Sequence, residues 1–209
     1  MYNDKILEAV NSFQRCQRNF DLDKTVDPEI VELLYTVALT TPSKQNLVNF
    51  DVIAVTNREM VREVALAAVS ENVSFEDKRR LQNPQVDCNL LFIYVEKDNN
   101  KTPLKRLRDR GPLLTGASYH NLVQCEVGIS AGAVGLAAHL LGLRTGFSRC
   151  FTEELFPDSV FRSNRIDPLE TILLLGIGYP KYENHTLHTD GYNYSASFPK
   201  QKQRKIVLV

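Results

Sequence analysis

The segment from about Ala117 to Leu141 constrains the fold more than any other part of the chain. It is the longest stretch with helical character, and little of its surface is fully polar. Its apolar positions are Leu122, Cys125, Val127, Ile129, Val134, Leu136, Leu140 and Leu141. Its small residues, which let another backbone approach closely, are Gly128, Ser130, Ala131, Gly132, Ala133, Gly135, Ala137 and Ala138. We therefore expect a buried central helix, ended by Gly142.

A membrane-spanning helix is the alternative interpretation of this segment. Gly128 and Gly132 form the GxxxG pattern found where membrane helices pair. The uncharged stretch Val127–Leu143 is shorter than the span of about 20 residues that a bilayer requires, and it contains His139. We therefore favour the buried helix and predict no membrane association.

Three further segments have helical periodicity, and three short segments have the composition of strands. Because helices outnumber strands, we predict an α+β fold. No repeat or linker divides the chain, so a single domain over residues 1–209 is expected. The closing run Ile206–Val209 is expected to be buried as an added strand. The first predicted helix begins near Asn3, the second runs from Pro28 and is stopped by Pro42, and the third runs from Arg58 to about Ser70. The predicted strands are Phe50–Thr56, Leu90–Val95 and Thr171–Leu175.

The charge balance limits the classes of partner. The 209 residues include 25 Lys and Arg and 25 Asp and Glu, so the formal net charge is zero. Without a basic field, general binding of nucleic acid or of an anionic membrane has no support. No apolar signal segment opens the chain, so we expect a cytoplasmic protein with free thiols. No CxxC pattern occurs among Cys16, Cys88, Cys125 and Cys150, so no metal site is predicted.

The common catalytic signatures are absent from the chain. It contains no GxGxxG, GxxxxGK[ST], HExxH or GxSxG motif, so we predict no catalytic side chain. His185 and His188 lie in a polar tail without a partner motif, and His120 and His139 are interpreted as structural residues. The candidate functional residues are therefore groups that bind a ligand.

Two segments carry such groups. Arg15 and Arg18 follow the first helix three residues apart, so both guanidinium groups can converge on one anion. The alternative is two solvated surface arginines. The loop Thr41–Phe50 joins a helix directly to a strand, and it offers the polar side chains of Ser43, Lys44 and Asn46. The alternative here is a helix stop followed by a polar connection.

Taken together, these segments resemble the FMN-dependent nitroreductase family. Arg15-Cys16-Gln17-Arg18 is similar to the family's motif after the first helix, and Pro42-Ser43-Lys44-Gln45-Asn46 to its P-S-x-x-N motif. The order and spacing of the motifs extend across nearly the whole chain. The other similar segments are Glu126–Ile129 in the long helix, Leu141–Gly146 in the glycine turn, Leu175–Pro180 at a strand end and the basic pair Lys202 and Arg204.

The resemblance implies a small, mainly antiparallel sheet flanked by helices, with the long central helix at a homodimer interface. It also implies FMN sites shared between the two subunits. A cluster of cations suits the phosphate of FMN, and the expected residues are Arg15, Arg18, Lys202 and Arg204, with Cys16 beside them. The resemblance implies that the flavin is lined from the other subunit by Pro42, Ser43, Lys44 and Asn46. It also implies flavin contacts from Asn83 and Gln85.

The function implied by the resemblance is that of an oxidoreductase. NADH or NADPH would pass a hydride to FMN, and FMN would reduce a small acceptor such as a nitroaromatic compound or a quinone. The chain departs from the family where Cys16 replaces a serine and where Asn49-Phe50 replaces a proline–aromatic pair. Two alternatives stay open: a flavin-dependent dehalogenase or flavin-fragmenting relative, and a non-catalytic flavin-binding or interaction protein.

Overall fold

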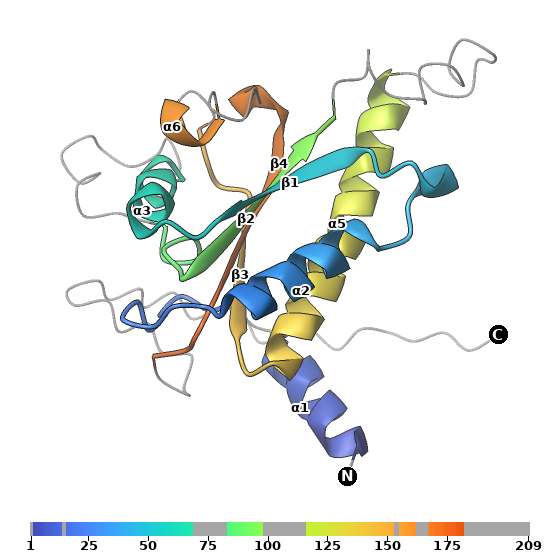
Figure 1. Ribbon diagram of the computed structural model, residues 1–209. Coiled ribbons are helices and arrows are strands. Elements are labelled where there is room, and N and C mark those ends of the chain that lie inside the picture. The colour runs from blue at the N-terminus through green and yellow to red at the C-terminus, as the bar shows by residue number, and fades with distance from the viewer. Residues whose placement is uncertain are drawn as a thin grey trace, which may run out of the picture.

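A computed structural model describes residues 2–13, 16–68, 83–97, 116–152, 155–161 and 167–181 of the chain (Figure 1). The helices in this part are α1 (Tyr2–Phe13), α2 (Pro28–Leu39), α3 (Arg58–Ala67), α5 (Gly116–Leu140) and α6 (Asp158–Phe161), with short 3-10 helices at Lys44–Asn46 and Pro168–Glu170. The strands are β1 (Phe50–Val55), β2 (Leu90–Glu96), β3 (Arg144–Ser148) and β4 (Thr171–Gly178).

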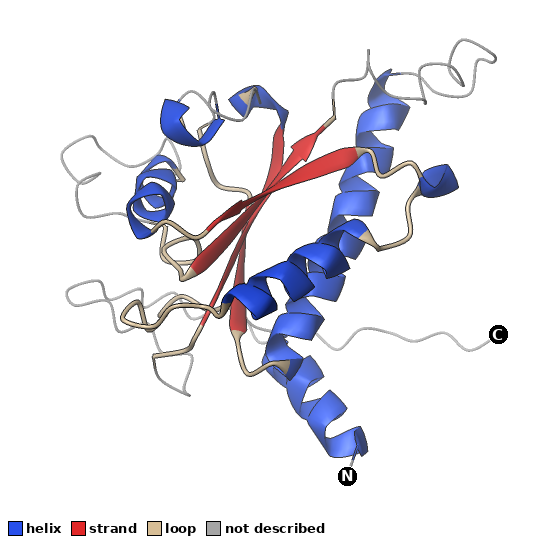
Figure 2. Ribbon diagram, viewed as in Figure 1, coloured by secondary structure: helices blue, strands red, loops and turns tan. Residues whose placement is uncertain are grey.

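The four strands form one twisted sheet in the order β1-β2-β4-β3 (Figure 2). Each neighbouring pair is antiparallel. All residues from Leu90 to Val95 of β2 are buried, as the continuous apolar run predicts for a strand covered on both faces. The prediction of an α+β fold with a small, mainly antiparallel sheet is confirmed.

Apolar clusters lie on both faces of the sheet. Alternate residues of β2 point to opposite faces, so Phe92 and Tyr94 enter one cluster and Ile93 enters the other. The first cluster is completed by residues of α2 and α5, and the second by residues of α3 and α6. Helices therefore cover the sheet on both sides, with α2 and α5 together on one of them (Figure 1).

The long helix α5 packs against α1, α2 and the sheet. By length and composition alone, its Tyr119–Leu140 part could cross a membrane, with a mean hydropathy of 1.2. Half of that part is buried inside the fold, however, and Val123, Val127 and Val134 have almost no exposed surface. These contacts are those of a core helix, in agreement with the interpretation favoured from the sequence.

The helix α1 is attached to the rest of the fold by its last turn. His139 of α5 lies between Ser12 and Thr145, with Nδ1 2.6 Å from Ser12 Oγ and Nε2 3.2 Å from Thr145 Oγ1. This arrangement is structural, as predicted for His139. Earlier in α1 the apolar stripe is only partly covered, because Ile6 and Val10 are 50% and 40% exposed.

One strand was not predicted from the sequence. Arg144–Ser148 contains few β-branched or aromatic residues, yet it forms β3 by pairing with β4 along its whole length. Tertiary pairing here overrides weak local propensity. Several predicted features lie outside the described residues, among them Arg15, the tail histidines, Lys202, Arg204 and the closing run Ile206–Val209.

Candidate functional site

The segment that follows α1 runs alongside β3. The backbone N–H of Gln17 donates to the carbonyl oxygen of Thr145 at 2.7 Å. The sulfur of Cys16 lies 4.0 Å from the carbonyl oxygen of Phe147. Arg18 is half-buried, and its Nη1 lies 3.4 Å from the carbonyl oxygen of Cys16. Two of the predicted phosphate-side residues, Cys16 and Arg18, thus flank Gln17, the residue whose backbone bonds to β3.

Asn83 and Gln85 reach the same strand from a distant part of the sequence. The side-chain nitrogen of Asn83 donates to Ser148 Oγ at 2.8 Å. Its side-chain oxygen accepts the backbone N–H of Gln85 at 3.0 Å. Asn83 therefore uses both ends of its amide to fix the turn that carries Gln85 against β3.

Two glycines make this convergence possible. A Cβ atom at Gly146 would lie 2.6 Å from the carbonyl oxygen of Gln85 and 2.8 Å from that of Gln17. A Cβ atom at Gly176 would lie 2.1 Å from the same Gln85 oxygen. Only glycine permits so close a backbone approach. The first group of predicted site residues is therefore assembled by packing across β3 and β4.

A second group lies on the loop between α2 and β1. Pro42, Lys44 and Asn46 are exposed, and Ser43 is half-buried. Ser43 Oγ accepts the backbone N–H of Val48 at 2.9 Å. Asn46 and Val48 have positive φ angles of 59° and 46°. Such an angle is uncommon for asparagine and an outlier for a β-branched residue, so surrounding contacts must hold the loop in a strained conformation.

Glu126 of α5 supplies contacts to this loop, and it was not predicted as a site residue. Glu126 as a whole is only 3% exposed. Oε1 accepts the backbone N–H of Lys44 at 2.7 Å, and Oε2 accepts that of Asn49 at 3.2 Å. The side-chain nitrogen of Asn49 lies 3.0 Å from each carboxylate oxygen. An acidic residue within an apolar helix was the available signal, but the sequence did not reveal its partners.

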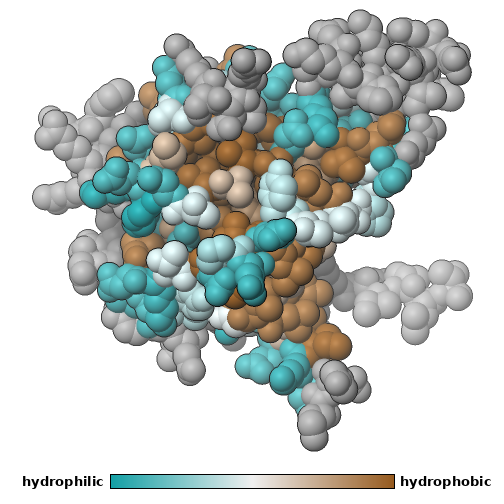
Figure 3. Space-filling view, viewed as in Figure 1, coloured by the Kyte–Doolittle hydropathy of each residue, from teal (hydrophilic) through white to brown (hydrophobic). Residues whose placement is uncertain are grey.

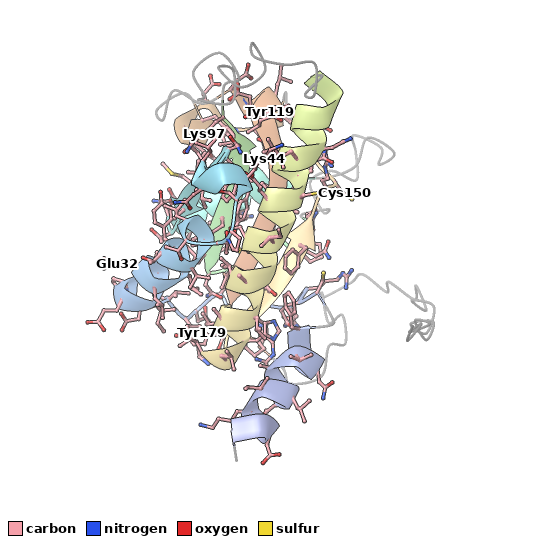
Figure 4. The ribbon with its side chains drawn as sticks, turned by 90° about the vertical axis from the view of Figure 1, so that its right-hand side faces the viewer. Glu32, Lys44, Lys97, Tyr119, Cys150 and Tyr179 are labelled. Atoms are coloured by element: carbon pink, nitrogen blue, oxygen red, sulfur yellow. The ribbon has the colours of Figure 1, made fainter. Side chains whose placement is uncertain are left out.

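The elements that carry the two groups meet α5 at different heights. Glu126 meets the loop, whereas Phe13, whose ring packs on Phe147 of β3, meets α5 at Gly135 and His139. At 1.5 Å per residue these positions are about 14 to 20 Å apart along the helix. Figure 4 shows Lys44 and Cys150, the latter just after β3, on opposite sides of α5. Within one chain, the predicted flavin residues therefore form two half-sites.

The chemistry of the two half-sites differs in a way that suits FMN. The β3 half-site contains the guanidinium group of Arg18, which is a suitable partner for a phosphate. The loop half-site presents hydroxyl, amide and backbone groups, which can hydrogen-bond to a flavin ring. In the described part of the chain, no group of three or more His, Cys, Asp and Glu side chains could hold a metal ion.

Comparisons with known proteins identify the family and the fold of this chain. The model of the nitroreductase family matches residues 12–179. A search of curated proteins finds no match. Solved structures share the fold at low sequence identity. A nitroreductase-like protein from Streptococcus mutans has a TM-score of 0.66 and 17% identity, with 90% of this chain and 95% of that chain covered.

Two other solved structures carry information on ligands. A provisionally assigned nitroreductase from Exiguobacterium sibiricum, in complex with FMN, has a TM-score of 0.62 and 14% identity, with coverage of 88% and 91%. A provisionally assigned NAD(P)H:FMN oxidoreductase from Staphylococcus epidermidis has a TM-score of 0.63 and 16% identity, with coverage of 87% and 89%. The family match spans most of the chain and the fold agrees with it, so this chain belongs to the nitroreductase family.

Proposed function

We propose that the protein is an FMN-dependent oxidoreductase that uses NADH or NADPH and a small acceptor. Membership of the nitroreductase family supports an oxidoreductase, and two similar structures are described with FMN. The observation that carries the proposal is that the segment bearing Arg18 and the turn bearing Asn83 and Gln85 converge on β3. The family resemblance implies flavin contacts from these residues. When bound, FMN would supply the chemistry, by taking a hydride from the nucleotide and reducing an acceptor such as a nitroaromatic compound or a quinone.

The work of this chain's own residues is then to bind and orient. Arg18 would pair with the phosphate, together with Arg15, Lys202 and Arg204, and Cys16 would lie beside them. The turn fixed by Asn83 would present Gln85 to the flavin. Pro42, Ser43, Lys44 and Asn46 would line the ring from the loop half-site. No catalytic side chain is required under this proposal.

The proposal includes a homodimer. A second copy would bring the loop half-site of one chain to the β3 half-site of the other, which one chain cannot do alone. The face of α5 between the half-sites is open: Ile129 is 50% exposed, and added Cβ atoms at Gly128 and Gly132 would meet no described atom within 4 Å. Figure 3 shows apolar surface along this helix. Such a face suits close packing of two copies.

Residues 1–209 would act as a single domain in the cytoplasm under the same proposal. A formal net charge of zero supports small-molecule substrates in place of nucleic acid or a membrane surface.

Titration of the flavin-free protein with FMN and with riboflavin tests the phosphate half-site. We predict that Arg18→Ala weakens FMN binding by about 30-fold or more, because a buried phosphate would lose a charge-assisted partner worth at least about 2 kcal/mol. Riboflavin lacks the phosphate, so its affinity should stay the same. Arg62→Ala on α3 is the matched control and should bind both flavins like the wild type. Equal FMN affinity in Arg18→Ala and wild type would remove the support for this half-site.

A further inference from the structure

We propose that Glu126 is a positioning residue for the flavin site. Its carboxylate holds the Ser43–Asn49 loop in the conformation from which Ser43, Lys44 and Asn46 line the flavin. The effect of Glu126 on flavin binding rests on the proposed function. The contacts that carry it, however, lie entirely within the described part of this chain.

The carboxylate of Glu126 binds the loop at both of its ends. One oxygen accepts the backbone N–H of Lys44, where the short 3-10 helix begins, and the other accepts the backbone N–H of Asn49, just before β1. The side chain of Asn49 adds hydrogen bonds to both oxygens. The two strained residues, Asn46 and Val48, lie between these anchor points. Glu126 therefore fixes the ends of the segment whose middle is conformationally unfavourable.

The middle of the loop has anchors of its own. The N–H of Val48 donates to Ser43 Oγ, and its carbonyl oxygen accepts from Lys97 Nζ at 3.0 Å. Lys97 Nζ also lies 3.3 Å from a carboxylate oxygen of Asp51. Figure 4 shows Lys97 and Lys44 near one another beside the upper part of α5. Because strain persists only where several contacts over-determine it, the loop is held in advance in one conformation.

A role in stability alone does not account for this carboxylate. A buried charge is costly, and an apolar residue at a buried helix position is often at least as stabilising. No described cation forms an ion pair with Glu126, and each of its hydrogen bonds to described residues ends on Lys44 or Asn49. Among the described residues, the carboxylate of Glu126 thus bonds only to the loop. We infer that its role is to keep the loop in the conformation that binds a ligand.

Replacement of Glu126 by glutamine tests the proposal. The amide of Glu126→Gln places a donor where N–H groups of the loop need an acceptor, so the loop loses an anchor. The loop faces the flavin ring, which FMN and riboflavin share. We therefore expect both ligands to bind at least about tenfold more weakly, by the same factor. Arg18→Ala, by contrast, should weaken FMN alone.

The matched control is Ser130→Ala, about one turn further along the same face of α5. Ser130 is fully buried and donates to the carbonyl oxygen of Ala38 at 2.7 Å. Its hydrogen bonds to described residues end on Ala38 and Tyr94, and neither residue belongs to the Ser43–Asn49 loop. It should bind both flavins like the wild type. If Ser130→Ala weakens both flavins as much as Glu126→Gln does, general softening of α5 explains the result and the proposal is wrong.

Amide hydrogen exchange of the flavin-free protein gives a second measurement that does not depend on the ligand. The N–H groups of Lys44 and Asn49 should be protected in wild type and in Ser130→Ala, and should exchange faster in Glu126→Gln. Unchanged exchange at these amides would overturn the proposal, as would a loss of FMN affinity with riboflavin unaffected.

If Glu126→Gln does not fold, Asn49→Ala provides a second variant that removes only the side-chain hydrogen bonds of Asn49 to Glu126. It should shift amide exchange and both flavin affinities in the same direction, and no shift would overturn the proposal. If wild type binds neither flavin, the proposed function fails, while the exchange result still decides whether Glu126 holds the loop.

Discussion

Cys88 shows how the fold sets the chemistry of a single side chain. The thiol is fully buried and donates to the carbonyl oxygen of Leu90 at 3.1 Å. Burial raises the pKa of the Cys88 thiol from 9.0 to about 12, because the thiolate would lose its hydration. A thiol that stays protonated near neutral pH is a poor nucleophile and a poor target for oxidation. Cys88 therefore acts as a packing residue, and burial raises the pKa of Tyr94 in the same way.

The raised pKa of Cys88 predicts a loss of stability at alkaline pH. In the unfolded chain the thiol gives up its proton near pH 9.0, whereas in the folded protein it keeps it until about pH 12. Between these values the unfolded state binds fewer protons, so the free energy of unfolding falls as pH rises, by up to about 1.4 kcal/mol per pH unit. Urea unfolding at several pH values above 9 measures this slope.

Matched variants separate this effect from the rest of the alkaline titration. Cys88→Ala should flatten the slope without abolishing it, because Tyr94 contributes with the same sign. Val86→Ala, which shortens another fully buried side chain of the same apolar cluster and removes no titratable group, should leave the slope as in wild type. An equal slope in Cys88→Ala and wild type would contradict the assignment.

At the scale of elements, α5 organises the molecule. One face of the helix is buried against α2 and the sheet, its Glu126 holds the loop before β1, and its last turns hold α1 through His139. The opposite face carries Ile129, which the described part of the chain leaves 50% exposed. One helix thus lies between the two half-sites and also presents the surface through which a second copy would bring them together.

Substitution on the open face of α5 tests the proposed dimer. We predict that the wild type scatters light with twice the mass of one 23.7 kDa chain at micromolar concentration. Ile129→Asp should give the mass of one chain, because a charge at the centre of an apolar interface is costly. Leu169→Asp, at a 65% exposed leucine before β4, is the matched control and should remain dimeric. A wild-type mass near that of a single chain would contradict the dimer.

The sequence predicts those elements whose pattern is local. The apolar stripe of α2, with Pro28 in its first turn, and the unbroken run of β2 give these elements close to their observed bounds. It does not predict β3, because Arg144–Ser148 becomes a strand only by pairing with β4. The partners of Glu126 are missed for a similar reason, since its contacts to Lys44 and Asn49 join residues that periodicity cannot relate.

At the scale of the whole molecule, the predicted site residues lie in two half-sites and not in one cleft. Arg18 and the turn at Asn83 are beside β3, and the Ser43–Asn49 loop is on the other side of α5. Under the proposed function, these residues belong to one site only if two copies associate. No catalytic motif would then be needed, because both half-sites would bind and orient the flavin.

The most direct test of the account is the visible spectrum of the purified full-length protein after incubation with FMN, removal of free flavin, and anaerobic addition of NADH or NADPH. The account predicts that FMN remains bound to the protein. It further predicts that the nucleotide bleaches the flavin absorbance, and that a quinone or a nitroaromatic compound restores it. A protein that retains no FMN, or that retains FMN whose absorbance neither nucleotide changes, would contradict the proposed oxidoreductase.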